Sequence, residues 1–301
     1  MGNIKDSIRA ILRDITQETP DVKTFRFELE KSLDYRPGHS VILGCKSQTI
    51  RDYVEMLYST GDIVELAREE SMKRIGSKQY TKRPYSIATP PTRAVGDDNG
   101  VYIEVTIEKK EKIKNSNGVD FLYKGSFSNY MLNAAKEGEE FEIFGVTKNE
   151  NFVYDENSTR NYLGIAASSG IVPIMCHLRY IVDMNLKRDV VIIYSNRYRP
   201  DNIIYRKELE SIQSMADNLK YPNFKIKIVN IITRNEDPEW KGRVSRMDSE
   251  LIRDVVDDLK NRTCFVCGGG KFIQDISKQL TGLGVADDDI RIDMWEKIDS
   301  K

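Results

Sequence analysis

The sequence predicts an α+β protein of two domains, a small antiparallel β-barrel followed by a doubly wound parallel α/β domain. Its first half contains short runs that alternate apolar and polar residues, such as Val101–Glu108, separated by Gly and Pro turns. In its second half, apolar strand-like runs alternate with helical runs. The polar stretch Asp155–Thr159 separates the two patterns. We therefore predict a barrel domain over residues 1–156 and an α/β domain over residues 157–301.

The apolar periodicity predicts the individual elements in order. The expected strands of the first half are Ile11–Thr16, Val22–Leu29, His39–Gly44, Val101–Glu108 and Glu140–Phe144. The expected strands of the second half are Tyr162–Ala167, Val190–Tyr194, Lys225–Ile232, Thr263–Cys267 and Ile290–Trp295. The helices expected between them are Ile171–Met184, Tyr205–Asn218, Asp248–Leu259 and Phe272–Leu280. Strands that alternate with helices predict a parallel sheet covered on both faces.

A helical insert at about residues 46–79 interrupts the barrel pattern. Ile50–Tyr58 and Ile63–Ile75 carry apolar residues at helical spacing, and Gly61 separates them. We expect two short helices here. They either form a surface excursion that packs on the barrel or a lid or partner-docking element, because the insert leads directly into Arg83.

Composition and charge exclude several classes of protein. The formal net charge of the 301-residue chain is −1, which gives no electrostatic signal for nucleic acid. No apolar run approaches the roughly 20 residues that a membrane span needs. The N-terminus lacks the apolar core of a secretion signal, so we expect a cytoplasmic protein.

Cysteine usage argues against a metal centre. The four cysteines are scattered, whereas a plant-type iron–sulfur cluster needs several of them clustered. Cys264 and Cys267 form a C-x-x-C pair, but the chain has only two histidines, and both are far away in sequence. We therefore expect no bound metal.

The first motif that carries chemistry is Arg83-Pro84-Tyr85-Ser86. An arginine fork suits a diphosphate. The tyrosine ring beside it can lie against a planar isoalloxazine, and the Ser86 hydroxyl can bond the reactive edge of that ring. The alternative is a plain strand with an exposed tyrosine.

The second motif is Gly125-Ser126-Phe127-Ser128, ahead of the helical run Tyr130–Lys136. Backbone N–H groups at a helix start bind anions, and we expect Ser128 to cap the helix. The alternative is a capped helix without a ligand. Because this motif follows the first one, we expect a second contact with the flavin diphosphate.

The third motif is Ser168-Ser169-Gly170, which follows the first strand of the second half and begins a helix. Small residues let the backbone approach a pyrophosphate, and a helix N-terminus attracts it. The motif is not G-x-G-x-x-G, which disfavours an ordinary dinucleotide-binding dehydrogenase. A plain strand-to-helix turn is the alternative.

A fourth group, Ser195 with Arg197, follows the second strand, where the adenosine ribose lies in doubly wound sheets. Both side chains suit the 2′-phosphate of NADPH, whereas Asn196 suits the plain ribose of NADH. The pattern leaves the choice between the two nucleotides open, and a charged turn without a ligand is also compatible with it.

Two further groups follow the last two strands. Cys267-Gly268-Gly269 places a thiol beside a backbone without side chains, and we expect Cys267 to contact the nicotinamide. Asp293 and Trp295 lie near the C-terminus, where Trp295 can cover the flavin and Asp293 can relay a proton. The alternative for this last pair is an edge strand with a capping tryptophan.

Together these motifs resemble the ferredoxin–NADP⁺ reductase superfamily. R-P-Y-S at 83–86 matches its R-x-Y-S motif, and G-S-F-S at 125–128 matches its G-x-x-S motif. A-S-S-G-I-V-P at 167–173 and C-G-G-G at 267–270 resemble its nicotinamide loop and its C-G-x-x element, and Pro37-Gly38-His39 looks like its P-G-Q element. The resemblance implies a six-stranded FAD-binding barrel followed by an NADP-binding domain.

The resemblance also implies an activity. A relative of this kind is an FAD-dependent oxidoreductase that exchanges a hydride with NADPH or NADH and passes single electrons to ferredoxin, flavodoxin or a similar carrier. It implies catalytic roles for Ser86, Cys267, Asp293 and Trp295. Because no iron–sulfur domain is recognised in the chain, we expect a separate acceptor. The alternatives are an electron-transfer subunit of a larger complex and a non-catalytic flavin- or nucleotide-binding regulatory module.

Overall fold

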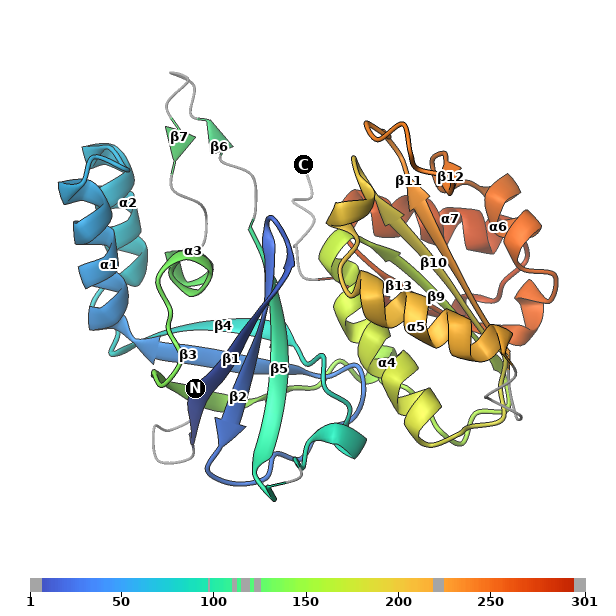
Figure 1. The fold of residues 1–301 in the computed structure, drawn as a ribbon, viewed down its shortest axis with the longest axis horizontal. Helices are drawn as coiled ribbons and strands as arrows, with labels where there is room; N and C mark the ends of the chain where they lie inside the picture. Colours follow the sequence, from blue (N-terminus) through green and yellow to red (C-terminus); the bar gives the residue numbers. More distant parts are fainter. Residues whose placement is uncertain are drawn as a thin grey trace.

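Two β-sheets, each with its own hydrophobic core, lie side by side (Figure 1). A computed structural model of the chain describes residues 7–96, 98–109, 126–218 and 225–294, together with the backbone of 113–114 and 120–121. Two of the expected residues, Gly125 and Trp295, lie outside the described residues. The boundary between residues 156 and 157 stays a prediction.

The first sheet is a six-stranded antiparallel barrel with the order β4-β3-β8-β1-β2-β5. Its strands are β1 (Ile8–Thr19), β2 (Val22–Leu29), β3 (Ser40–Lys46), β4 (Tyr80–Ser86), β5 (Val101–Glu108) and β8 (Glu140–Thr147). A bridge between Ile87 and Val105 joins the two edges of the sheet, so the sheet closes on itself as predicted. Two short strands, β6 (Ile113–Lys114) and β7 (Asp120–Phe121), form a separate pair.

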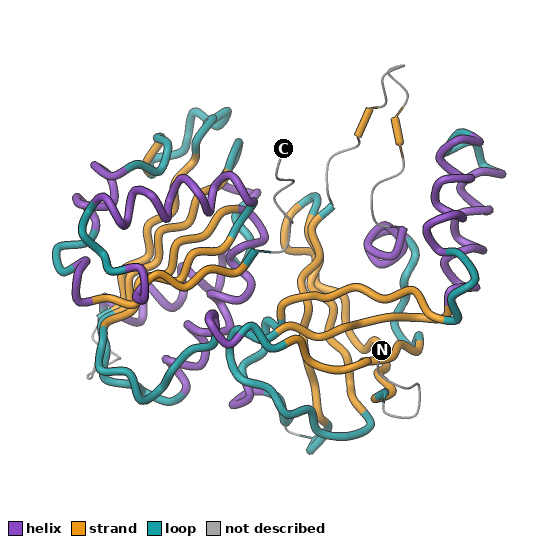
Figure 2. Tube along the Cα trace, turned by 180° about the vertical axis from the view of Figure 1, so that it is seen from behind, coloured by secondary structure: helices purple, strands orange, loops and turns teal. Residues whose placement is uncertain are grey.

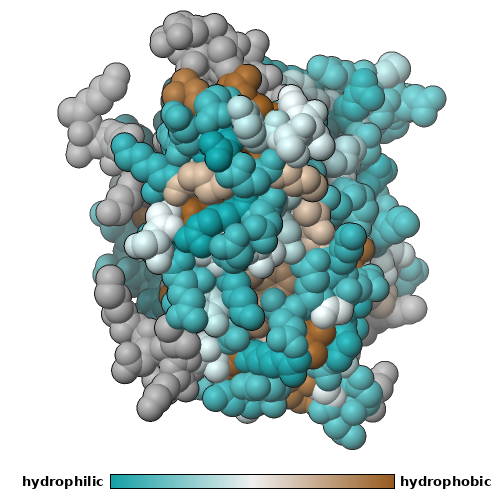
Figure 3. Space-filling model, turned by 90° about the vertical axis from the view of Figure 1, so that its left-hand side faces the viewer, coloured by the Kyte–Doolittle hydropathy of each residue, from teal (hydrophilic) through white to brown (hydrophobic). Residues whose placement is uncertain are grey.

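The insert forms the two expected helices, α1 (Ser47–Ser59) and α2 (Glu65–Ile75), on the side of the barrel away from the second sheet (Figure 1). Tyr53 of α1 lies edge-on to Tyr130, with 5.6 Å between ring centroids. The face that carries the insert is mostly hydrophilic (Figure 3). Four exposed apolar side chains lie around the turn between the two helices, namely Met56, Tyr58, Val64 and Leu66.

The second sheet is parallel and has the order β12-β11-β10-β9-β13-β14. Its strands are β9 (Asn161–Ala167), β10 (Val190–Asn196), β11 (Ile226–Ile232), β12 (Arg243–Val244), β13 (Arg262–Cys267) and β14 (Ile290–Asp293). Strands β10, β11 and β12 follow one another on one side of β9, whereas β13 and β14 lie on its other side. The strand order therefore reverses between β9 and β13. In open α/β sheets, ligands bind beyond the carboxyl ends of the strands at such a switch point.

Helices cover both faces of the parallel sheet (Figure 2). They are α4 (Ile171–Asp183), α5 (Arg206–Asp217), α6 (Ser249–Val255) and α7 (Gly270–Gly282). Apolar residues of α4 and α5 form one core with the sheet, and those of α6 and α7 form another. Helix α6 is shorter than the predicted Asp248–Leu259. It ends at Val255, because Val256 adopts an extended backbone.

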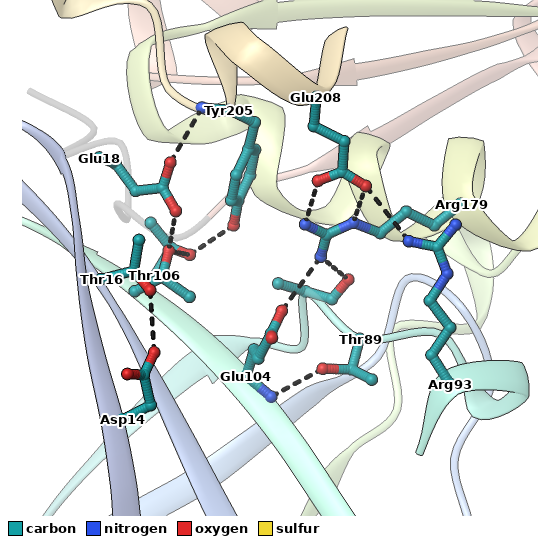
Figure 4. Close-up of polar contacts among 12 residues, drawn as sticks. Asp14, Thr16, Glu18, Thr89, Arg93, Glu104, Thr106, Arg179, Tyr205 and Glu208 are labelled. Atoms are coloured by element: carbon teal, nitrogen blue, oxygen red, sulfur yellow. Dashed lines mark hydrogen bonds and ion pairs between the residues drawn. The ribbon is translucent and has the colours of Figure 1, made fainter. Parts of the chain in front are cut away.

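Buried polar contacts connect the barrel to the α/β domain (Figure 4). Arg179 of α4 donates to both carboxylate oxygens of Glu208 of α5, at 3.0 and 2.6 Å, and to the carbonyl oxygen of Ala88 at 2.9 Å. The Tyr205 hydroxyl bonds the Thr106 hydroxyl of β5. The bonds to Ala88 and Thr106 cross from the α/β domain to the barrel, so they hold the two domains in register, while the bidentate contact with Glu208 fixes the orientation of the Arg179 guanidinium.

His177 of α4 lies in the same interface, as a structural residue rather than a ligand. It is fully buried, and its Nδ1 lies 3.0 Å from the Tyr162 hydroxyl. Its ring stacks on Phe152 with 5.3 Å between centroids. Gly38 has φ +99°, and a Cβ there would lie 2.8 Å from Nε2 of His177, so this close approach requires glycine. Burial lowers the pKa of His177 to about 3.

Candidate functional site

The Arg83-Pro84-Tyr85-Ser86 motif ends β4, which pairs with β3. Arg83 is exposed to solvent. The Tyr85 ring packs near Phe127 with 6.2 Å between centroids, and its hydroxyl lies 2.8 Å from Oγ of Ser128. Burial raises the pKa of Tyr85, which keeps it a neutral hydrogen-bonding phenol. This bond brings the first two sequence motifs together.

The second motif forms the start of α3 (Ser126–Asn133). The expectation that Ser128 caps this helix is wrong, because the helix already includes Ser126. Phe127, the residue before Ser128, belongs to the helix and is fully buried in the barrel core. Ser128 therefore lies in the first turn with its hydroxyl on Tyr85.

The donors around α3 fit a diphosphate. First-turn N–H groups have no partner within their own helix, and they attract anions together with the helix dipole. The Asn129 side-chain nitrogen is buried and has no acceptor among the described residues. Arg83 adds a positively charged side chain that is exposed to solvent. Gly125, the first residue of the motif, lies outside the described residues.

The Ser168-Ser169-Gly170 motif and the Cys267-Gly268-Gly269 group meet at the carboxyl ends of β9 and β13. Ser168–Gly170 forms a single 3₁₀ turn between β9 and α4. A Cβ on Gly170 would lie 2.2 Å from the carbonyl oxygen of Cys267, so only glycine allows this approach. Around Gly269 a Cβ would meet nothing within 4 Å, which leaves the backbone open to a ligand. Gly268, between Cys267 and Gly269 in the chain, is buried.

Asp293 lies next to Cys267 in the parallel register of β13 and β14. The Cys267 thiol is fully buried, 4.0 Å from Oδ2 of Asp293. Burial raises the pKa of Asp293, while a 3.1 Å hydrogen bond from the Asn149 amide opposes the rise. The sheet thus brings together a thiol and a carboxyl that holds its proton more readily than usual. Contact of Cys267 with a nicotinamide stays a prediction.

Ser195 and Arg197 lie at the carboxyl end of β10, beside β9. Ser195 pairs with Ala167, the residue before the Ser168–Gly170 turn. Ser195 is buried, whereas Arg197 is exposed. The backbone N–H of Arg234, from the end of β11, donates to the Arg197 carbonyl at 2.6 Å. These residues line the same edge of the sheet as the Ser168–Gly170 turn.

Glu108 was missed by the sequence analysis. It is the last residue of β5 in the barrel, yet its carboxylate reaches the Ser168–Gly170 turn of the other domain. It accepts hydrogen bonds from the Ser169 hydroxyl at 2.6 Å and the Ser169 N–H at 3.4 Å, and from the Ser168 hydroxyl. In the sequence Glu108 is only the outward polar position of an alternating strand, so no signal marked it.

The described residues show neither a membrane span nor a metal cluster. None of the described helices is both long enough and apolar enough to cross a bilayer. Within the described ranges, no three His, Cys, Asp or Glu side chains are grouped so that they could hold a metal ion.

Comparison with known proteins identifies similar sequences. Residues 165–278 match the family model of the oxidoreductase NAD-binding domain. The glycine betaine monooxygenase reductase subunit of Pseudomonas aeruginosa is 29% identical over 274 residues, which cover 90% of this chain. The chain spans 59% of the length of that relative.

Solved structures share the whole fold. The FAD/NAD-binding domain of nitric oxide dioxygenase from Vibrio cholerae superposes with a TM-score of 0.68 at 16% identity, covering 96% of this chain and 98% of that one. A ferredoxin–NADP⁺ reductase mutant from Plasmodium falciparum, in complex with 2′P-AMP, superposes with a TM-score of 0.65 at 16% identity, covering 98% of each chain. The predicted two-domain fold is therefore confirmed.

Proposed function

We propose that this chain, which belongs to the ferredoxin–NADP⁺ reductase-like FAD- and NAD-binding oxidoreductases, takes a hydride from NADPH or NADH onto FAD and passes the electrons on singly. Its acceptor is a separate redox protein such as ferredoxin, flavodoxin or a similar carrier. The relative from Pseudomonas aeruginosa is a reductase subunit of a monooxygenase, which supports a protein acceptor.

One observation carries the proposal. At the switch point between β9 and β13, Gly170 approaches the Cys267 carbonyl so closely that only glycine is tolerated there. The Ser168–Gly170 turn and the Cys267–Gly269 loop thereby form one edge, the place where open α/β sheets bind nucleotides.

The flavin is held by the barrel. Arg83 and the first turn of α3 would hold its diphosphate, Tyr85 would offer a ring face to the isoalloxazine, and Ser86 would offer a hydroxyl to the edge of that ring. The Tyr85–Ser128 hydrogen bond orients the ring for this contact. Bound FAD supplies hydride exchange with a nicotinamide and electron release in single steps.

The α/β domain binds the nicotinamide nucleotide. Ser168, Ser169 and Gly170 take its pyrophosphate, and Ser195 with Arg197 takes the adenosine ribose or its 2′-phosphate. Cys267 orients the nicotinamide, and Asp293 lies at the same edge as a carboxyl that takes up a proton more readily than usual, because burial raises its pKa. The contribution of the protein is chiefly positioning of the two rings.

An anaerobic absorbance titration with NADPH and then NADH tests the proposal. We expect a bound flavin that one nucleotide bleaches rapidly. Tyr85→Phe and Ser128→Ala each lose one hydrogen bond and weaken FAD binding by about fivefold to tenfold. Tyr58→Phe, at an exposed site on the insert, serves as the matched control. A colourless protein, or a bound flavin that neither nucleotide reduces, contradicts the proposal and favours a regulatory module.

A second candidate is an electron-transfer subunit of a larger complex. Four exposed apolar side chains at the turn of the insert favour it, namely Met56, Tyr58, Val64 and Leu66. Poor electron transfer by the isolated chain, restored by a co-purifying partner, supports this candidate.

A further inference from the structure

We propose that Glu108 occupies the pyrophosphate position of the nucleotide loop and thereby sets the affinity for NAD(P)H. The inference rests on the proposed function, because it assigns the Ser168–Gly170 turn to the pyrophosphate. Glu108 comes from the barrel, so the nucleotide must displace a contact between the two domains before it binds.

The contacts of Glu108 are those of an anion in an anion site. Its two carboxylate oxygens accept from the hydroxyls of Ser168 and Ser169 and from the Ser169 N–H. This turn leads directly into the 13-residue helix α4, whose N-terminus carries partial positive charge. A phosphate oxygen would accept hydrogen bonds from the same donors, so the Glu108 carboxylate and a pyrophosphate cannot occupy this turn at the same time.

The loop is accessible to a ligand. Ser168 is exposed, and Ser169 and Glu108 are half-buried, so a nucleotide can reach the turn from solvent. Ser168 has φ +50°, a left-handed conformation that L-residues other than glycine seldom adopt. The bond between its hydroxyl and Glu108 is one contact that holds the turn in this shape.

Displacement of Glu108 needs only a side-chain movement. Arg179 still connects α4 to Ala88 of the barrel, and Tyr205 still connects α5 to Thr106. With these contacts in place, the domains stay in register while the Glu108 carboxylate turns away. The carboxylate then remains near the pyrophosphate, and like charges at this range repel each other.

Glu108→Gln removes the charge and keeps the shape. We expect it to bind NADP⁺ and NAD⁺ about tenfold more tightly than the wild type, equal to about 1.4 kcal/mol. The measurement is isothermal titration calorimetry of the FAD-loaded protein, so it does not depend on turnover. Glu28→Gln is the matched control, because it removes a carboxylate from the adjacent strand β2, where Glu28 pairs with Arg13. The control should leave affinity unchanged.

A double-mutant cycle shows whether Glu108 acts through the loop. In a Ser169→Ala background, which lacks one donor, the gain from Glu108→Gln should shrink severalfold. Unchanged or weakened binding by Glu108→Gln, with a wild type that binds nucleotide, overturns this inference alone. If neither protein binds NADP⁺ or NAD⁺, the proposed function falls and this inference falls with it.

Discussion

The buried His177 makes stability depend on pH in a direction that the structure defines. Its ring is fully buried, and burial lowers its pKa to about 3 from the ordinary value of 6.5. The unfolded chain therefore binds a proton at a higher pH than the folded protein does. Stability from this residue is present above pH 6.5 and is lost as the pH falls from 6.5 towards 3.

The size of the effect follows from the linkage relation. Between pH 7 and pH 5, the proton occupancy of this site in the unfolded state rises from about one quarter to nearly one, while the folded state stays neutral. At about 1.36 kcal/mol per pKa unit, the free energy of unfolding falls by about 2 kcal/mol over this range. Because pH 5 lies well above the folded pKa, this value does not depend on how low that pKa is.

His177→Phe tests this reasoning. Phenylalanine keeps the ring contact with Phe152 but cannot take up a proton, so its stability should fall by about 2 kcal/mol less between pH 7 and pH 5. At pH 7 it loses the Tyr162 hydrogen bond, which costs about 1 kcal/mol. The lowered pKa of His39 affects both proteins equally and cancels in the comparison.

The assay is urea unfolding of the FAD-loaded protein at both pH values. Tyr162→Phe is the matched control, because it removes the same hydrogen bond and keeps the titrating ring. It should be less stable than the wild type by a similar amount at each pH. If His177→Phe loses as much stability as the wild type between pH 7 and pH 5, the reasoning is refuted.

Two further predictions concern the switch point and the domain interface. Gly170→Ala places a Cβ against the Cys267 carbonyl and should destabilise the protein by about 1–3 kcal/mol, whereas Gly269→Ala, with open space around it, should leave the melting temperature nearly unchanged. Arg179→Met leaves the Glu208 carboxylate without its bidentate partner and should cost about 2 kcal/mol in urea unfolding, which an added Glu208→Leu should partly restore. An Arg179→Met protein as stable as the wild type would show that solvent compensates for this ion pair.

The sequence predicted the two-domain fold because local patterns report which side of a strand or helix is buried. Val22–Leu29 and Val101–Glu108 are strands with the expected bounds, since each alternates apolar and polar residues. The alternation of strands and helices predicted the parallel sheet. The order of the strands in that sheet was not predicted, and it is the pairing of β9 with β13 in the structure that brings Ser168–Gly170 and Cys267–Gly269 together.

Packing between distant segments overrode one local signal. Ser128 carries a good capping side chain, but the helix already includes Ser126 and Phe127, and the Phe127 ring packs in the barrel core. Helix boundaries depend on such contacts because a cap contributes only about 1 kcal/mol, less than the burial of an aromatic side chain. A local sequence pattern does not show which side chains will be buried by contact with distant segments.

By itself the sequence determined the order of barrel and α/β domain and the loops that follow individual strands. Only the tertiary structure decided that Glu108 of the barrel lies on the Ser168–Ser169 turn and that His177 is sealed between the domains beside Gly38. Periodicity describes how one segment faces its own core, whereas these contacts join segments about 60 to 140 positions apart through domain packing. Their geometry depends on the register of both domains at once, which no single stretch of sequence encodes.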